Sequence, residues 1–160
     1  MLLYHGNTVI IEEPSLMASN ANLDLGPGFY TTTNLEQAVR LSKKAAMRRG
    51  GSPVVSVYDL DDADLKDLKV KVFESPDREW LGSVIANRRG VNSSSAYDLI
   101  IGSVADDDVY GTISLFESGF YSEEEALNHL KVKKLFNQYV FVSEEAVKRI
   151  VFKGVISDGE

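Results

Sequence analysis

The sequence predicts an α+β fold, in which short helices flank a core of several short strands. Segments rich in β-branched and aromatic residues recur along the 160 residues, and helical spacings of apolar residues lie between them. No internal repeat, low-complexity tract or linker divides the sequence. Because 44% of the residues are hydrophobic, the chain can bury a full core, and we expect one domain over residues 1–160.

The first third of the chain predicts two strands and one helix. Residues 2–5 and 28–32 have the composition of strands, and a polar, Asn-rich segment connects them. The spacing of Thr33 and Glu36 matches a capping box, in which each side chain accepts a backbone N–H of the other residue. We expect a helix to begin there and to end at Gly50-Gly51.

The middle third predicts two more strands and a second helix. Residues 54–60 are β-branched and aromatic, and residues 68–73 alternate apolar side chains with lysine. Ser75 and Pro76 would supply the N-cap and first residue of a helix that Gly90 ends.

The last third predicts three strands, over residues 97–104, 138–143 and 151–152. The spacing of Ser122 and Glu125 is a second capping box, which starts a helix. A short helical turn follows Ser143.

The composition excludes several classes of site. With no cysteine, the chain has no disulfide, zinc-thiolate site or thiol nucleophile, and a reducing cytoplasm suits it. Two histidines without cysteine make no metal constellation, so we expect no metal cofactor. Residues 1–5 do not read as a signal peptide, and no apolar run approaches the length of a membrane span. We therefore expect a cytoplasmic protein without a membrane partner.

The net charge of -7 argues against a general surface for duplex nucleic acid. A local basic group nevertheless lies on one predicted helix and its exit. It is either a solvated helix face or a contact for an anionic substrate. Its members are Arg40, Lys43, Lys44, Arg48 and Arg49.

His5 and Tyr30 are the main candidates for a binding site. An imidazole within a strand, beside a glycine that lets another group approach closely, needs a partner or a ligand. The glycines before Tyr30 have no side chains and leave room beside it, so a flat ring could lie on the tyrosine face beside the hydroxyls of residues 31–33. Both residues could instead serve the core. His129, on a predicted helix, is an ordinary surface or boundary histidine.

Three motifs in order carry a resemblance to a known family. They are Tyr4-His5-Gly6, Gly28-Phe29-Tyr30-Thr31-Thr32 and Asn137-Gln138-Tyr139-Val140-Phe141. Together they resemble the signature of the ADP-ribosyltransferases of the diphtheria-toxin and poly(ADP-ribose) polymerase branch. Residues 24–30 and 97–102 resemble, more closely still, a bacterial family of uncharacterised proteins grouped with these enzymes.

The resemblance implies one ADP-ribosyltransferase-like domain, with a split, mainly antiparallel β core. It implies a mono-ADP-ribosyltransferase that uses NAD as co-substrate, with His5, Tyr30 and Gln138 as the catalytic set. His5 would hydrogen-bond the adenosine ribose, Tyr30 would stack on the nicotinamide, the Gly6 backbone would pair with the carboxamide, and Thr31 would support the nicotinamide ribose. Separately, the guanidinium of Arg88 could meet the pyrophosphate, or Arg88 could be an ordinary surface residue.

The same resemblance suggests a bacterial toxin or defence effector, with a macromolecular acceptor of unspecified class and a cognate antitoxin as partners. Two positions depart from the family. Gln138 stands where the family usually has glutamate, and an amide cannot accept a proton. Leu41 stands near the place of a second aromatic residue that often clamps the nicotinamide.

These departures leave three hypotheses open. The protein is a transferase that is slow or uses another carboxylate, a module that binds NAD or ADP-ribose without turnover, or an NAD glycohydrolase. The candidates for another carboxylate are Asp106, Asp107, Asp108, Glu144 and Glu145, which could instead form a solvated acidic turn and a helix cap.

Overall fold

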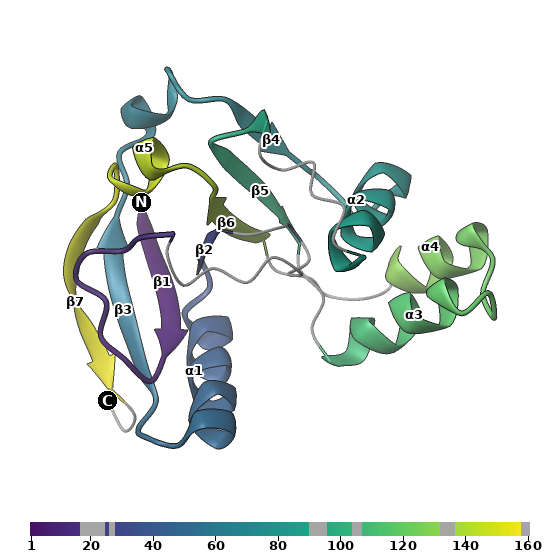
Figure 1. Cartoon of the computed structure of the whole chain (residues 1–160), viewed down its shortest axis with the longest axis horizontal. Helices are drawn as coiled ribbons and strands as arrows, with labels where there is room; N and C mark the ends of the chain where they lie inside the picture. Colours follow the sequence, from purple (N-terminus) through teal and green to yellow (C-terminus); the bar gives the residue numbers. More distant parts are fainter. Residues whose placement is uncertain (17–24, 26–27, 90–95, 104–106, 132–136, 158–160) are drawn as a thin grey trace.

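The described part of the chain folds around one seven-stranded sheet (Figure 1). The computed structural model describes residues 1–16, 25, 28–89, 96–103, 107–131 and 137–157. The sheet has the strand order β4-β5-β6-β2-β1-β3-β7, and its neighbouring strands are antiparallel except for the parallel pair β4 and β5. The strands are β1 (Leu2–Asn7), β2 (Phe29–Thr32), β3 (Val54–Asp59), β4 (Val70–Val72), β5 (Leu99–Ser103), β6 (Asn137–Phe141) and β7 (Val151–Ser157).

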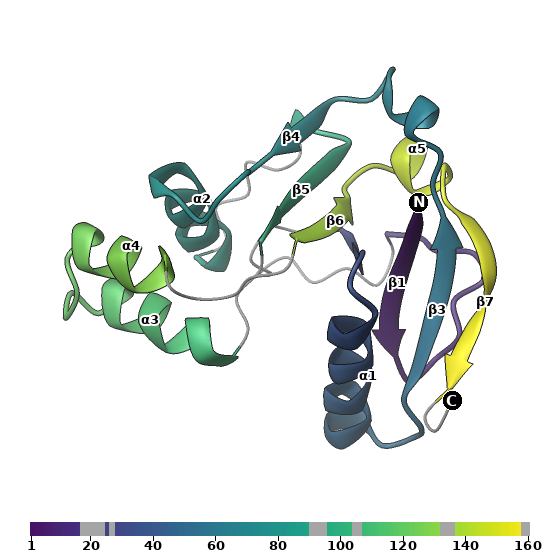
Figure 2. The same ribbon diagram turned by 180° about the vertical axis from the view of Figure 1, so that it is seen from behind.

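Short helices complete a mixed α+β fold, as the sequence predicts. The helices are α1 (Leu35–Arg49), α2 (Arg78–Arg88), α3 (Asp107–Glu117), α4 (Glu123–Lys131) and α5 (Glu144–Val147), with a 3-10 turn η1 (Asp62–Leu65). Helix α1 lies along β1, α2 lies beside β5, and the α3 and α4 pair lies beyond α2 (Figures 1 and 2).

The sheet is divided between β1 and β2. Strands β1 and β3 pair continuously, from Leu2 opposite Asp59 to Asn7 opposite Val54. Between β1 and β2, in contrast, the recorded register is a single pair, Tyr4 opposite Thr32. The part made of β1, β3 and β7 and the part made of β2, β6, β5 and β4 therefore diverge from this contact (Figures 1 and 2).

Each face of the sheet has its own core cluster. Ile100 and Val140 point from β5 and β6 toward α2, where Trp80 is fully buried. Phe29 and Phe141 point to the opposite face and pack with the residues around α5. Because side chains alternate along a strand, these two sets fix which way every other residue of the central strands points.

Two helices begin one or two residues later than the sequence predicts. The N-cap of α1 is Asn34, whose Oδ1 accepts the Gln37 N–H at 2.8 Å, and Thr33 is exposed. The N-cap of α2 is Asp77, whose Oδ1 accepts the Trp80 N–H at 3.0 Å. In both helices the N-cap is the side-chain oxygen of an Asn or Asp residue, and not the hydroxyl of the predicted Thr33 or Ser75.

The remaining predicted ends have mixed outcomes. The capping box of α4 is confirmed, because Ser122 and Glu125 each accept the backbone N–H of the other at 3.2 Å. Helix α3 was not among the predicted elements. It begins in the acidic run that the sequence suggests is a turn. Gly90, the predicted end of α2, lies outside the described residues.

Candidate functional site

Three predicted site residues lie on neighbouring strands at the centre of the sheet. His5 is on β1, Tyr30 on β2 and Gln138 on β6, and these strands are adjacent in the order β6-β2-β1. Tyr30 and Gln138 are more than one hundred residues apart in the sequence. The topology therefore brings the segments together at the place where β1 and β2 diverge.

Tyr30 and Gln138 share one face of the sheet. Gln138 lies directly opposite Thr32, and Tyr30 lies directly opposite Val140, so Tyr30 and Gln138 are diagonal neighbours. Such diagonal positions are about 7–8 Å apart. The Tyr30 ring packs against the α2 cluster, and its hydroxyl accepts the Leu25 N–H at 3.0 Å. One ligand can therefore reach both side chains.

The Gln138 side chain is buried, with 3% of its surface exposed. No hydrogen bond to its amide group occurs in the described residues. In the part of the chain that the structure describes, its amide atoms are not among the buried atoms that lack a partner, so they can be reached from the surface. Gln138 is therefore a candidate contact for a polar ligand, through one acceptor oxygen and two N–H donors.

His5 bridges the place where the two strands separate. By alternation its side chain points to the face opposite Tyr30, where the imidazole stacks on Phe29 with 4.4 Å between ring centroids. Its Nδ1 lies 2.6 Å from the Tyr30 carbonyl oxygen. A carbonyl oxygen only accepts, so Nδ1 carries the proton and donates it. The imidazole thus gives the Tyr30 carbonyl a hydrogen-bond donor at the point where the β1–β2 pairing ends.

The environment of His5 keeps its imidazole neutral. Burial lowers the pKa of His5 from its usual 6.5, the hydrogen bond to the Tyr30 carbonyl opposes this change, and the positive charge of Arg49 adds to it. With the proton on Nδ1, the lone pair of Nε2 is an acceptor. A ligand hydroxyl is a suitable donor for that lone pair.

The space in front of Gly6 is filled by helix α1. A Cβ atom at this position would lie 2.1 Å from the Ala38 carbonyl oxygen and 2.8 Å from the Ser42 nitrogen. The close approach that the sequence predicts at Gly6 is therefore made by the helix backbone. On one side the Gly6 backbone pairs with Val55 of β3. On the other side it lies beyond the Tyr4–Thr32 pair, where β1 and β2 separate.

The structure places neither the Thr31 side chain nor the His5 side chain on the face of Tyr30 and Gln138. Thr31 is 1% exposed, and its hydroxyl donates to the Tyr139 carbonyl oxygen at 2.9 Å. Strand alternation places it on the face opposite Tyr30. Arg88 is the last residue of α2, and its side chain lies outside the described residues.

The candidate replacement acids on α5 lie away from Gln138. The Glu144 carboxylate accepts the Leu16 N–H at 3.2 Å, and Glu145 forms an ion pair with Arg149 at 2.7 Å. Helix α5 packs on the face opposite Gln138. These two carboxylates therefore serve the structure around α5.

The other candidate acids are less fully described. Asp107 and Asp108 form the beginning of α3, and their side chains are outside the described residues. Asp106 lies entirely outside them.

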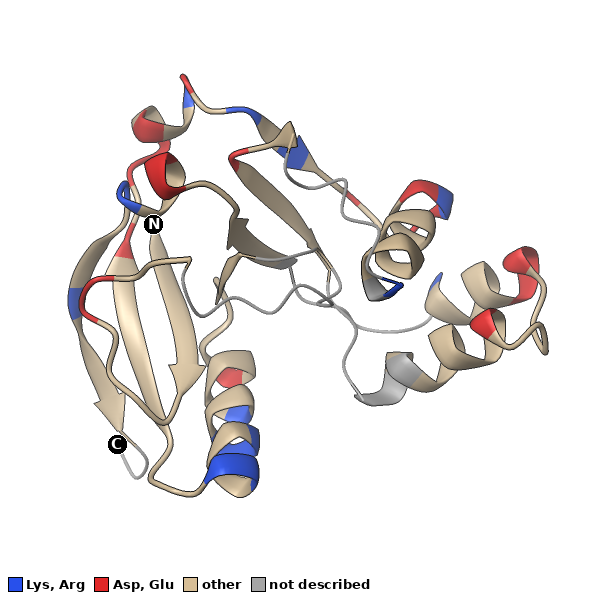
Figure 3. Cartoon of the chain, viewed as in Figure 1, with Lys and Arg blue, Asp and Glu red and all other residues tan. Residues whose placement is uncertain are grey.

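Charged residues surround the centre of the sheet but do not enter it (Figure 3). Strands β1, β2, β5 and β6 contain no Lys, Arg, Asp or Glu. The predicted basic group lies on α1 and gathers toward its C-terminal half (Figure 3). Leu41, also on α1, is 37% exposed. The candidate site is therefore lined by neutral polar and aromatic groups.

Sequence reasoning missed Gln37, a buried polar residue in the first turn of α1. Its side-chain oxygen accepts the Thr32 hydroxyl at 2.7 Å, and only 7% of Gln37 is exposed. The available signal was its helical register, since Gln37 precedes Ala38 on the face that also buries Ser42 and Ala45. Because that face was interpreted as apolar core, the polar residue Gln37 within it was overlooked.

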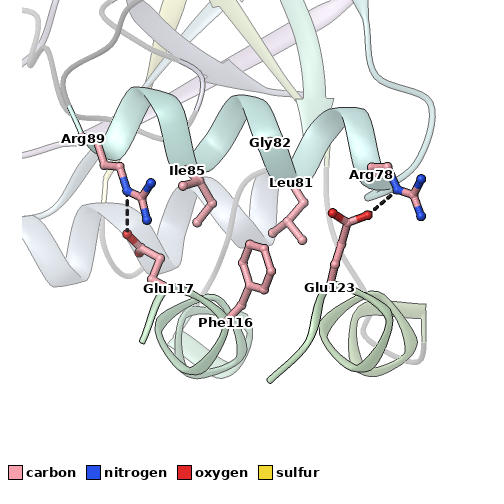
Figure 4. A pocket seen from close by; sticks show the side chains of 8 residues that line it. All are labelled: Arg78, Leu81, Gly82, Ile85, Arg89, Phe116, Glu117 and Glu123. Carbon is pink, nitrogen blue, oxygen red and sulfur yellow. Dashed lines mark ion pairs between the residues drawn. The ribbon is translucent and has the colours of Figure 1, made fainter. Parts of the chain in front are cut away.

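A pocket of about 320 Å³ lies elsewhere, between α2 and the α3 and α4 pair (Figure 4). Phe116 points toward Leu81 in its middle, and the ion pairs of Arg78 with Glu123 and of Arg89 with Glu117 bridge its two ends. None of its lining residues belongs to β1, β2 or β6. They are Arg78, Leu81, Gly82, Ile85, Arg89, Phe116, Glu117 and Glu123.

Two classes of site have no counterpart in the described ranges. No group of three or more His, Cys, Asp or Glu residues there is placed to hold a metal ion. None of the helices there combines the length and the apolar character of a membrane span.

No curated protein matches the chain. The model of a family described as "Protein of unknown function (DUF3990)" matches residues 1–152, and the chain belongs to that family.

Proposed function

We propose that this protein is an NAD-dependent mono-ADP-ribosyltransferase. One observation carries the proposal: His5, Tyr30 and Gln138, from three distant motifs, lie on three adjacent strands where the sheet divides. The order of these motifs resembles that of known ADP-ribosyltransferases, and the strand order explains why such distant motifs would act together. The proposed acceptor is a macromolecule.

The side chains suit the parts of NAD. The Tyr30 ring, half-buried on the sheet face, offers a surface on which the nicotinamide ring can stack. The Gln138 amide can hydrogen-bond a hydroxyl of the nicotinamide ribose. The His5 side chain lies on the face opposite Tyr30 and Gln138, so the adenosine ribose would have to meet His5 Nε2 where β1 and β2 separate. The Gly6 backbone beyond the last β1–β2 pair can meet the carboxamide. Arg88 is left as the proposed pyrophosphate contact.

The reaction breaks the bond between C1′ of the ribose and the pyridinium nitrogen. The bonding electrons go to the nitrogen, so nicotinamide leaves neutral, and positive charge develops on the ribose. An acceptor nucleophile then bonds to C1′ and loses a proton. A neutral imidazole and amide oxygens tolerate this charge better than cations would, since dipoles fixed around a developing charge stabilise it.

Transfer of label from NAD tests the proposal. Protein incubated with NAD labelled in its adenosine part and a bacterial lysate should label a macromolecule. A double variant, His5→Ala with Tyr30→Ala, should give no label, and circular dichroism of both proteins checks that they are folded. Equal labelling by the two proteins would show that this site is not a transferase site.

A second candidate function is binding of NAD or ADP-ribose without turnover. The uncharged centre of the sheet favours it, because Gln138 cannot accept a proton as a glutamate does. Calorimetric binding of NAD without nicotinamide release would support this function. Hydrolysis is distinguished in the same assay, since a glycohydrolase produces free ADP-ribose and no labelled macromolecule.

Substitution Gln138→Glu separates a slow enzyme from a binding module. A positioned acid or base contributes about 10²- to 10⁴-fold to a rate, so the variant should release nicotinamide at least about 10²-fold faster if Gln138 faces the reacting ribose. An unchanged rate would direct attention to the carboxylates of residues 106–108.

The cellular role that we propose, a cytoplasmic bacterial toxin or defence effector with a cognate antitoxin, rests on the family resemblance alone. Expression of the protein in bacteria should slow growth, and expression of a Tyr30→Ala variant should not. Equal growth in both cultures would argue against a toxin.

A further inference from the structure

The hydroxyl of Thr32 connects the end of β2 to the first turn of α1. Its Oγ1 accepts the Asn34 N–H at 3.0 Å and donates to Oε1 of Gln37 at 2.7 Å. Because the Gln37 oxygen is the acceptor in this bond, both N–H donors of its amide remain for another partner. Among the described residues, the Gln37 amide nitrogen is not one of the buried atoms that lack a partner, so a group outside the core can reach it.

This amide belongs to the same face as the candidate site. Thr32 lies directly opposite Gln138, and Cβ atoms of such pairs are about 4.5–5.5 Å apart. Tyr30 lies two residues before Thr32 and points the same way. Thr32, Gln37 and Gln138 are 1%, 7% and 3% exposed. Two buried amides, from α1 and β6, therefore flank one position next to the Tyr30 ring.

The neutral character of this face determines what it can hold. A ligand carboxylate buried there would meet amides and hydroxyls but no cation from the central strands (Figure 3). The Lys and Arg residues of α1 gather toward its C-terminal half, and Arg40, three residues after Gln37, is exposed. Burial of an unpaired charge is strongly unfavourable. A carboxamide, in contrast, is uncharged, and its oxygen can accept from the Gln37 NH₂ group while the Gly6 backbone meets its other side and Gln138 remains for the ribose.

We propose that Gln37, held in place by Thr32, is a specificity-determining residue that selects a ligand with an uncharged carboxamide over the matching carboxylate. The inference rests on the proposed function, because it concerns the nicotinamide end of NAD. It adds a residue of α1 to the site and assigns the Thr32 hydroxyl a positioning role.

Titrations with NAD and with nicotinic acid adenine dinucleotide, its carboxylate counterpart, test this inference. The unmodified protein should bind NAD about 10²-fold more tightly, since a site built for a neutral hydrogen-bonding group rejects an unmatched one strongly. Gln37→Met, which keeps the length of the side chain, should reduce the preference to less than about tenfold. The neighbouring exposed substitution Glu36→Gln should leave the preference unchanged.

A second pair of variants tests the positioning role of the Thr32 hydroxyl. Thr32→Ser keeps the hydroxyl and should keep the preference, whereas Thr32→Val removes it and should lower the preference as Gln37→Met does. If the unmodified protein binds NAD and Gln37→Met retains the full preference, Gln37 has no role in selection and the proposed function still stands. If the unmodified protein binds neither dinucleotide, both proposals fail.

Discussion

His5 shows how one side chain can serve both the fold and a site. Its Nδ1 holds the Tyr30 carbonyl where β1 and β2 stop pairing, and its ring stacks on Phe29. The sequence identified His5 as a histidine that needs a partner, and the structure supplies two. That strand residues 5 and 30 meet at a division of the sheet could not be derived from local patterns, because pairing between strands is a tertiary property.

The lowered pKa of His5 predicts a pH dependence of stability. An unfolded chain protonates this imidazole near pH 6.5, whereas the folded protein resists protonation. The unfolded state therefore binds more protons as the pH falls, and the free energy of unfolding should decrease from pH 7 to pH 5, by at most about 1.4 kcal/mol per pH unit. Urea unfolding at several pH values measures this decrease.

The control for this pH dependence is the second histidine. The decrease should vanish in His5→Gln and persist in His129→Gln. The same pH profile for His5→Gln and the unmodified protein would show that another group causes the decrease.

Gly6 and Gly82 make a second test at the residue scale. A methyl group at Gly6 would collide with the α1 backbone, whereas nothing lies within 4 Å of a Cβ atom at Gly82. Overpacking typically costs about 1–3 kcal/mol, so Gly6→Ala should lower the free energy of unfolding by at least that amount. Gly82→Ala, in the middle of α2, should leave it unchanged or raise it. Thermal or urea unfolding measures both effects. Equal effects of the two substitutions would contradict the packing of α1 on Gly6.

At the scale of elements, local signals predicted most of the helices and strands but placed some ends wrongly. Gly50 and Gly51 end α1 as expected, because both adopt positive φ values of 77° and 88°. The start of α1 is set by Asn34 rather than Thr33, since the hydroxyl of Thr32 holds the Asn34 N–H. The choice between adjacent capping residues depends on a tertiary contact that no sequence window contains.

The corrected cap of α1 predicts different effects for two adjacent residues. Asn34→Ala removes the acceptor of the Gln37 N–H and should cost about 1 kcal/mol of stability. Thr33→Ala, at an exposed position before the cap, should change stability by less than about 0.5 kcal/mol. A larger effect of Thr33→Ala in chemical unfolding would restore the capping box that the sequence suggests.

At the scale of the whole molecule, the strand order creates the candidate site. Strands β1, β2 and β6 are adjacent although they come from opposite ends of the chain. The α+β class follows from periodicity, and the family resemblance gave an order of motifs. Neither alone fixes side-chain direction, and this is why Thr31, one residue from Tyr30, was expected in the site but faces the other way. Gln37 was missed for the converse reason, since it is a polar residue on a buried helix face.

Calorimetric titration with NAD tests the central claim most directly, because it requires neither an acceptor nor turnover. The unmodified protein should bind NAD, and Tyr30→Ala should weaken binding by at least about tenfold, since stacking contacts of an aromatic ring contribute about 0.5–1.5 kcal/mol beyond the area buried. The His129→Ala variant should bind as the unmodified protein does. The absence of NAD binding by the folded protein, or equal binding by Tyr30→Ala, would contradict a site for NAD at the division of the sheet.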